Sequence, residues 1–362
     1  MDLQGDGLPS PLVPYLQTRV GQSLPLDSRG EPLTEQLAGL IIVMAAGLFN
    51  GAFAIPMRYN LRWKWENTWL AFCTCSLVIF PWILVGLMVA HVGPIFHSLS
   101  IGDMTPALVF GFLWGIAQAT FGVSINLLGV SVAVPIVSAI AIILGAFVPV
   151  AVQNPKALVG PLGLLLVVSS AFLIASLMFY ARAAQMRESG SPSKKSRLGL
   201  FLAIFTGIFG GAINIGFALS GKIVERAAAL GNGPRAATYC VWAVVLAAGF
   251  IPNLLYCSYL ISRNKTGQVF TSGGSLLEFS RSILMAVFWI LGTTLYGIST
   301  TFMGKFGTSV GYLLYGSFSI LFANIIGWKA GEWAGASPQS RRWFWSAMGL
   351  VLVSVATLGF RV

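Results

Sequence analysis

Acidic side chains are the residues most able to bind a proton or a cation, and all eleven lie away from the centres of the long apolar segments. A proton relay buried at the middle of a membrane, as in many coupled carriers, is therefore absent. Coupling to an ion would have to use an acid near a helix end, such as Glu66 or Glu225, or a lysine such as Lys222. The alternative is that these three residues are interfacial anchors and helix caps. The other acidic residues are Asp2, Asp6, Asp27, Glu31, Glu35, Asp103, Glu188, Glu278 and Glu332.

The polar residues inside the apolar segments are neutral. They include the amides Asn50, Gln118, Asn126, Asn214, Asn253 and Asn324. Because an amide both donates and accepts hydrogen bonds, such a set suits a neutral ligand rich in hydroxyl groups. An anionic substrate would instead require a buried Arg or Lys. The alternative is that each amide joins two helices together, and both interpretations stay open for every one of them.

Aromatic residues supply the other half of a sugar site, because ring faces pack on the C–H faces of pyranoses. A cavity lining is expected from Trp114, Phe121, Trp289, Tyr296, Tyr312 and Tyr315. A second group lies at the predicted span ends, where an interfacial belt accounts for it: Trp63, Trp65, Trp69, Trp328, Trp333, Trp343 and Trp345. We therefore predict a substrate site at Asn50, Trp114, Gln118, Asn214, Trp289 and Tyr296.

Catalytic and metal-binding motifs are missing. The sequence contains no P-loop, no GxSxG and no HExxH. Its two histidines, His91 and His97, fall in one predicted loop, and its four cysteines lie in apolar stretches without CxxC spacing. The sequence thus predicts neither an enzyme nor a cofactor or metal site, and transport must draw on an ion gradient or a partner protein.

The composition is that of a membrane protein: 56% of the 362 residues are hydrophobic, 9% are charged and the mean hydropathy is +0.81. A spanning helix needs about 20 mostly apolar residues, and ten segments qualify. They cover residues 37–57, 68–90, 105–128, 130–152, 157–180, 198–220, 236–261, 282–303, 308–328 and 343–360. Gly129 and the stretch 304–307 are expected to turn two tight helical hairpins.

Three weak internal matches suggest a duplicated five-helix unit. Gly47 and Gly51 reappear as Gly207 and Gly211, both pairs reading GxxxG; Phe80-Pro81 is answered by Ile251-Pro252; and Trp114, Phe121, Gly122, Ser124 and Gly129 match Trp289, Tyr296, Gly297, Ser299 and Gly304. Since five is odd, the second copy enters the bilayer from the opposite side, which is transporter architecture. The predicted fold is all-α, with ten transmembrane helices as an inverted five-plus-five repeat.

This repeat divides the chain into a flexible N-terminal tail over 1–36, a first repeat over 37–181, a basic cytoplasmic linker over 182–197 and a second repeat over 198–362. Alternate loops differ in charge: one side carries 14 of the 22 Lys and Arg residues. By the positive-inside rule that side is cytoplasmic, so both termini are expected outside. The net charge of +11 therefore reports topology rather than a nucleic-acid partner.

Four segments resemble the L-rhamnose/proton symporters of the drug/metabolite transporter superfamily. The resemblance is carried by Gly51, Pro56 and the run Trp63-Lys64-Trp65-Glu66-Asn67-Thr68-Trp69; by Phe110-Gly111, Leu113-Trp114-Gly115, Gln118 and Gly122; by Lys222, Glu225, the run 227–231 and Asn253; and by Ser317-Phe318 with Glu332-Trp333. It covers roughly residues 38–360. It implies ten helices, an inverted repeat, and uptake of a deoxyhexose with a proton across the bacterial inner membrane.

The segment 293–316 departs from the pattern expected of the enterobacterial members, because it is poorer in large aromatic and charged residues. Which monosaccharide is carried therefore stays open, as does the oligomeric state. An exporter or exchanger of another small metabolite or of lipophilic cations is the alternative within the fold, although a cation exporter predicts a membrane-embedded acid. A membrane scaffold or receptor is the alternative outside it.

Overall fold

The computed structural model describes residues 33–187 and 197–359. In these ranges the secondary structure is helical, without strands, and ten helices are long and apolar enough to cross a membrane. The ten predicted spans are thus confirmed, with bounds that move by a few residues. The first helix begins at Leu33, inside the predicted tail; the rest of that tail and residues 188–196 of the predicted linker lie outside the described residues.

Five spans are single unbroken helices: α5 (Ile101–Leu128), α6 (Val130–Gln153), α7 (Pro161–Arg187), α11 (Pro234–Asn264) and α14 (Pro338–Gly359). Two others, α12 (Ser275–Thr300) and α13 (Gly307–Lys329), are equally continuous. Pro135 and Pro149 lie inside α6, and Pro252 lies inside α11, without interrupting either helix. These prolines are therefore accommodated within continuous helices.

The remaining three spans are irregular. The first consists of α1 (Leu33–Ala52) and a 3₁₀ turn at Ile55–Tyr59 that contains Pro56. The second consists of α2 (Trp65–Cys73), a π-helical segment at Thr74–Ile79 and α3 (Phe80–Met88), which has Pro81 in its first turn. The sixth is divided at Gly211 into α8 (Arg197–Gly210) and α9 (Ala212–Leu219). Interruptions of this kind mark functional positions in transporters.

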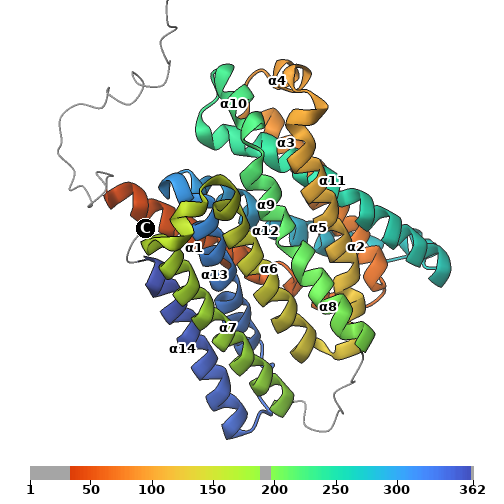
Figure 1. Cartoon of the computed structure of the whole chain (residues 1–362). Coiled ribbons are helices and arrows are strands. Elements are labelled where there is room, and N and C mark those ends of the chain that lie inside the picture. The colour runs from red at the N-terminus through yellow and green to blue at the C-terminus, as the bar shows by residue number, and fades with distance from the viewer. Residues whose placement is uncertain (1–32, 188–196, 360–362) are drawn as a thin grey trace, which may run out of the picture.

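Short helices lie outside the spans. The helices α4 (Val92–Ser98) and α10 (Gly221–Ala229) contact each other at one end of the molecule (Figure 1). The Asn232 side chain joins them to the second span, because it accepts from the Ala90 N–H at 2.8 Å and donates to the Ala90 carbonyl at 3.0 Å. Further 3₁₀ turns cover Pro155–Val159, Gly267–Thr271 and Gly304–Phe306.

Both expected glycine turns are present. Gly129, with a φ of +83°, separates α5 from α6, and Gly304, with a φ of +66°, begins the connection from α12 to α13. A residue with a Cβ would be strained in this left-handed region. Glycine therefore permits antiparallel neighbours to follow each other with almost no loop.

Helices approach each other closely where the two GxxxG pairs lie. The helix α1 packs on α12 and α13, whereas α8 packs on α5 and α6. A Cβ on Gly51 would lie 2.8 Å from the Ala323 nitrogen of α13, and one on Gly211 would lie 2.6 Å from the Ala141 oxygen of α6. The close contacts predicted for both pairs are confirmed. The glycines related by the repeat thus contact helices that the repeat also relates, which supports the duplicated five-helix unit. The inverted orientation of the two units stays a prediction.

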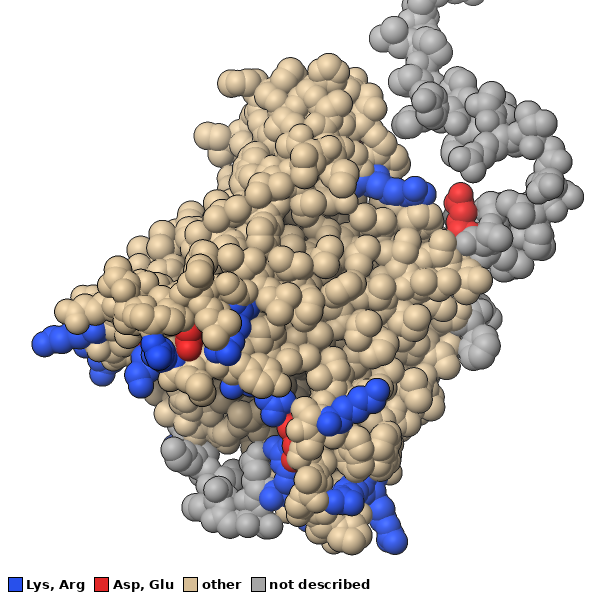
Figure 2. Space-filling view, turned by 180° about the vertical axis from the view of Figure 1, so that it is seen from behind, with Lys and Arg blue, Asp and Glu red and all other residues tan. Residues whose placement is uncertain are grey.

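The surface separates charge from apolar area. On the face shown in Figure 2, most Lys and Arg side chains gather toward the lower end of the molecule, and a broad uncharged area lies above them. Large apolar side chains such as Leu87, Leu164 and Phe201 are exposed on the spans. This is the surface of a chain whose middle is solvated by lipid. Figure 1 also shows α7 beside α14, the pair with the most extensive contact.

The backbone contact between α5 and α11 provides a test of this packing. A Cβ on Gly111 would lie 2.2 Å from the Val245 carbonyl oxygen, whereas nothing lies within 4 Å of one on Gly349 in α14. Gly111→Ala should therefore destabilise the protein by about 1–3 kcal/mol through overpacking. Gly349→Ala should be neutral or slightly stabilising. Thermal unfolding of both purified variants in detergent measures this, and equal Tm values would contradict the packing described.

Candidate functional site

Two tryptophans from different halves of the chain stack at the centre of the helical bundle. Trp114 of α5 and Trp289 of α12 have ring centroids 5.8 Å apart and planes inclined by 20°. Both are buried. The surrounding space, here called the chamber, is lined by Phe53, Trp69, Phe72, Cys73, Leu77, Trp114, Gln118, Asn253 and Trp289. The structure thus brings together Trp114 and Trp289, two of the predicted substrate residues, while their contact with a substrate stays a prediction.

Irregular backbone contributes directly to the chamber wall. Phe53 lies in the break that follows α1, and Leu77 lies in the π-helical segment of the second span. Non-helical backbone at membrane depth is tolerated only where protein buries it or where it lines a cavity. The first and second spans thus each contribute one residue to the chamber from a stretch that departs from α-helix.

Two amides face the chamber, and they differ in their bonding. The Asn253 oxygen accepts from the Trp69 indole N–H at 3.0 Å, and its nitrogen donates to the Gly249 carbonyl at 2.9 Å. No hydrogen bond joins the half-buried Gln118 side chain to any described residue. Because an amide can make several hydrogen bonds, Gln118 keeps its donors and its acceptor for a ligand.

The chamber is closed in this conformation. The volume left between its side chains for solvent is about 10 Å³, close to the minimum that one water molecule needs. A monosaccharide is far larger than one water molecule. This conformation, called the occluded form below, therefore has no room for a sugar, and admitting one requires the helices or the aromatic side chains to move apart.

Asn214 and Tyr296 form a second polar centre, further along α12. The Tyr296 hydroxyl contacts the Asn214 side-chain oxygen and lies 2.9 Å from the Thr308 carbonyl oxygen. The Asn214 nitrogen donates to the Gly145 carbonyl at 2.8 Å and to that of Thr308 at 3.1 Å. Both residues are fully buried. Here they connect α6, α9, α12 and the start of α13.

Aromatic stacking reinforces this second centre. Tyr296 stacks on Tyr315 with ring centroids 5.0 Å apart and meets Tyr312 edge-on at 5.7 Å. Trp289 and Tyr296 lie on the same face of α12, separated by about 10 Å of helix rise. The predicted site residues on α12 thus occupy two levels, one at the chamber and one at the tyrosine cluster.

Asn50 lies outside the chamber lining. Its side-chain nitrogen donates to the Ser319 hydroxyl at 2.9 Å, which joins α1 to α13. The backbone of α12 lies close to that of α1 at this point, because a Cβ on Gly292 would lie 3.0 Å from the Asn50 backbone nitrogen. In this conformation Asn50 and Asn214 both hold helices together, whereas Gln118 is available to a ligand.

The three predicted coupling residues are not brought together. Glu66 is buried in the first turn of α2 and accepts from the Asn264 amide at 3.0 Å and from the Thr266 hydroxyl at 3.1 Å. Lys222 and Glu225 are exposed on α10, where their charged groups pair at 3.0 Å. Glu66 alone of the three is enclosed by protein.

Three residues with notable contacts here are not among the predicted site residues. Asn253 is one of six similar amides in the apolar segments, and the sequence does not distinguish it from the others. Trp69 lies at a predicted span end, which fits the interfacial belt, but the structure places it in the chamber wall. Glu278 was counted only as an acid near a loop, yet it is 3% exposed and accepts three backbone hydrogen bonds. The sequence does relate Glu278 to Asp103, because the two acids are separated by the same number of residues as Trp289 and Trp114.

Comparison with known proteins agrees with this arrangement. The family described as L-rhamnose-proton symport protein (RhaT) matches residues 36–359. The chain belongs to this family. It is a family of proton-coupled sugar transporters rather than enzymes, so the resemblance found in the sequence and the predicted transporter class are confirmed. As a member with ten apolar helices, the chain is a multi-pass membrane protein.

Curated relatives match over most of their length. The L-rhamnose-proton symporter of Cronobacter sakazakii is 26% identical over 317 residues, which cover 84% of this chain and 91% of the relative. That of Escherichia coli K12 has the same identity and coverage. The L-rhamnose-proton symporter of Yersinia pestis is 26% identical over 308 residues, covering 82% of this chain and 90% of the relative. The residues matched by the family, 36–359, span the chamber and the tyrosine cluster.

The bond between Tyr296 and Asn214 predicts a stability effect. Tyr296→Phe would leave the buried Asn214 oxygen without its hydroxyl donor, which typically costs about 1–3 kcal/mol. Tyr59→Phe is the matched control, since the Tyr59 side chain is 62% exposed. Thermal unfolding should show a lower Tm for Tyr296→Phe alone. If both variants unfold at the wild-type temperature, the bond does not hold the helices together.

Proposed function

We propose that this chain imports L-rhamnose together with a proton across the bacterial inner membrane. The membership of its family and the names of its relatives support the substrate and the coupling ion. The observation that carries the proposal is the chamber itself: a stacked tryptophan pair from both halves of the chain beside the unpartnered Gln118 amide.

The chemistry of the chamber fits a neutral deoxyhexose. Such a sugar presents a methyl group and C–H faces beside its hydroxyl groups. The rings of Trp114 and Trp289 can pack on the apolar faces, and the Gln118 amide can both donate to and accept from hydroxyls. The described residues that line the chamber carry no charge, which disfavours lipophilic cations and organic anions as cargo.

We assign different roles to the six predicted substrate residues. Trp114, Gln118 and Trp289 contact the sugar, and Asn253 orients Trp69 at the same chamber. Asn50, Asn214 and Tyr296 cross-link helices in the occluded form. They become available to the sugar only in a conformation that releases those bonds.

Alternating access follows from the duplicated organisation. Two five-helix units of opposite orientation, residues 37–181 and 198–362, would enclose the chamber and rock about it. The equivalent contacts of α1 and α8 support this arrangement. The Lys and Arg distribution supports cytoplasmic loops at the basic end and periplasmic termini.

Glu66 is the proposed proton-binding residue. It is enclosed by protein, and one turn further along α2 Trp69 lines the chamber. A carboxyl group that gains or loses its charge beside Asn264 and Thr266 changes which hydrogen bonds it can make. Lys222 and Glu225 stay a second proposal for coupling, as an exposed pair at the opposite end of the molecule.

Sugar binding at the chamber predicts the effect of removing its free amide. Gln118→Leu keeps the size of the side chain but removes every hydrogen bond to the substrate, so L-rhamnose uptake into cells should fall about tenfold or more. Gln268→Leu, on the exposed turn at Gly267–Thr271, is the control. Competition by a panel of unlabelled monosaccharides identifies the preferred sugar. Unchanged uptake by a correctly inserted Gln118→Leu protein would place the substrate elsewhere.

Proton coupling predicts a separate effect at Glu66. Addition of L-rhamnose to de-energised cells should make the medium more alkaline as protons enter with the sugar. Glu66→Gln cannot exchange a proton, so this alkalinisation should disappear while exchange of labelled for unlabelled sugar persists. Glu35→Gln, on an exposed acid in the first turn of α1, should behave as wild type. Full alkalinisation by Glu66→Gln would exclude Glu66 as the coupling group.

A further inference from the structure

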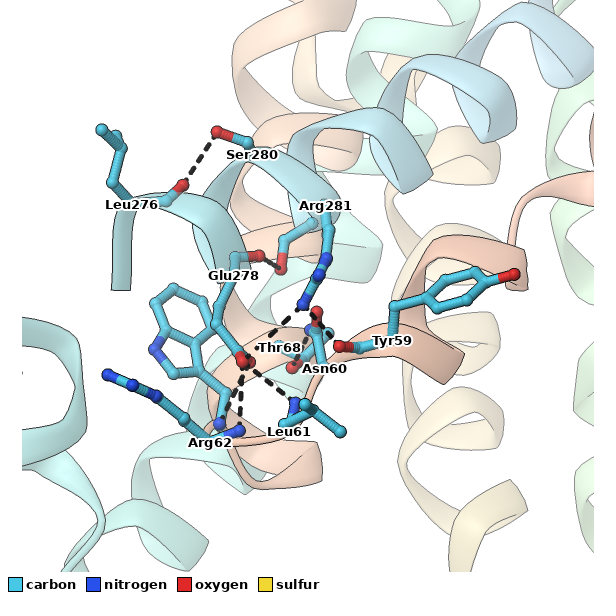
Figure 3. A network of polar contacts seen from close by, with 11 residues as sticks. Tyr59, Asn60, Leu61, Arg62, Thr68, Leu276, Glu278, Ser280 and Arg281 are labelled. Carbon is cyan, nitrogen blue, oxygen red and sulfur yellow. Dashed lines mark hydrogen bonds and ion pairs between the residues drawn. The ribbon is translucent and has the colours of Figure 1, made fainter. Parts of the chain in front are cut away.

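Glu278 binds a loop that belongs to the other half of the chain. Its carboxylate accepts from the backbone N–H groups of Leu61 and Arg62, each at 3.0 Å, and from that of Trp63 at 3.1 Å (Figure 3). The loop connects the first and second spans, whereas Glu278 lies in the first turn of α12. Charge-assisted bonds of this kind are about twice as strong as neutral ones.

Arg281 completes this attachment. Its guanidinium donates to the Tyr59 carbonyl oxygen and lies 3.9 Å from the Glu278 carboxylate. Figure 3 shows Glu278 and Arg281 projecting from α12 toward the same loop. One turn of α12 thereby binds three N–H donors and one carbonyl acceptor of the loop backbone.

A second carboxylate makes the reciprocal attachment. Glu66, in the first half, accepts from Asn264, the last residue of α11 in the second half, and from Thr266, which follows that helix. The neighbouring Asn67 amide donates to the Thr266 carbonyl at 3.1 Å. We call this arrangement the crossed latch: Glu278 with residues 61–63, and Glu66 with residues 264 and 266.

The position related to Glu278 by the repeat behaves differently. Asp103 lies in the first turn of α5 and accepts only from Ser100, the residue that caps the same helix. It is therefore a local capping residue. Helix capping alone thus does not account for Glu278, whose three donors come from the opposite half of the chain.

The latch lies next to the chamber along two helices. Trp65 and Trp69 of α2 stack at 5.3 Å directly after the held loop, and Trp69 lines the chamber. On α12, Glu278 precedes the chamber residue Trp289 by about 16 Å of helix rise. Separation of the two latched loops would draw α2 and α12 apart on this side of the chamber.

We propose that the crossed latch closes the basic end of the transporter and that its release opens the chamber to that side. Glu278 acts as a positioning residue, because it touches the loop and not the sugar. This inference rests on the proposed function, since it assumes that the chamber is the site reached by alternating access.

Cys73 provides a reporter, because it lines the chamber and is 1% exposed. Replacement of the buried Cys75, Cys240 and Cys257 by Ser leaves Cys73 as the single thiol. Its reaction with a charged, membrane-impermeant methanethiosulfonate is then measured without sugar, in inside-out and right-side-out vesicles. Glu278→Gln replaces one of the two accepting oxygens by an NH₂ group, which faces the backbone N–H donors of the loop and weakens the latch. The rate of Cys73 labelling should therefore rise about fivefold or more. The rise is expected only in the vesicle orientation that exposes the basic end to the reagent.

Asp103→Asn is the matched control, and Glu278→Asp tests whether a carboxylate restores protection. A Glu278→Gln rate equal to that of Asp103→Asn would overturn the latch, as would an equal rise from both sides of the membrane. If Glu278→Gln does not insert, the combined Asn264→Leu and Thr266→Val changes test the Glu66 arm by the same readout. Failure of the wild type to carry L-rhamnose, with one-sided labelling retained, would refute the proposed function and leave the latch intact.

Discussion

Backbone polar groups that lose their helical partners must be enclosed by protein when the surroundings are hydrocarbon. This constraint explains where the spans of this transporter are irregular. The break after α1 contributes Phe53 to the chamber, the π-helical segment contributes Leu77, and the division at Gly211 lies against Ala141 of α6. Each of the three irregular stretches thus has part of its length against the chamber or a neighbouring helix, while α7 and α14 are regular throughout.

Close helix contact makes this enclosure possible. Gly51 brings α1 to the α13 backbone, Gly211 brings the sixth span to α6, and Gly111 brings α5 to α11. Larger residues at these positions would separate the helices and leave the irregular backbone uncovered. The same small residues therefore serve both packing and the proposed function, because they let the helices place two amides and three tryptophans around one space small enough to exclude bulk water.

Composition and apolar length were sufficient to predict the ten spans, and the GxxxG pairs were sufficient to predict where helices meet. The sequence could also pair Trp114 with Trp289, because the repeat spacing relates them. It could not separate the amides: Gln118, Asn214 and Asn50 have the same chemistry, and only their neighbours decide which is already bonded. The Ser319 hydroxyl, the Gly145 carbonyl and the Thr308 carbonyl that bond Asn50 and Asn214 are distant in sequence. Trp69 was misplaced for a similar reason, since its partner Asn253 comes from another helix.

The bonds at the basic end differ from those at the tyrosine cluster, although the repeat relates the two halves of the chain. The tyrosine cluster is held by neutral bonds among Tyr296, Asn214 and backbone carbonyls, whereas the loops at the basic end are held by the carboxylates of Glu66 and Glu278. A neutral hydroxyl–amide contact keeps the same donors and acceptors at any physiological pH. A carboxylate that accepts several N–H groups loses acceptor capacity when it is protonated. Protonation would therefore weaken the bonds at the basic end and leave the Tyr296–Asn214 contact unchanged, an asymmetry that a perfectly symmetric duplication would not supply. Glu278 opposite Asp103 is thus a position at which the two halves have departed from the repeat, and the proposed latch depends on that departure.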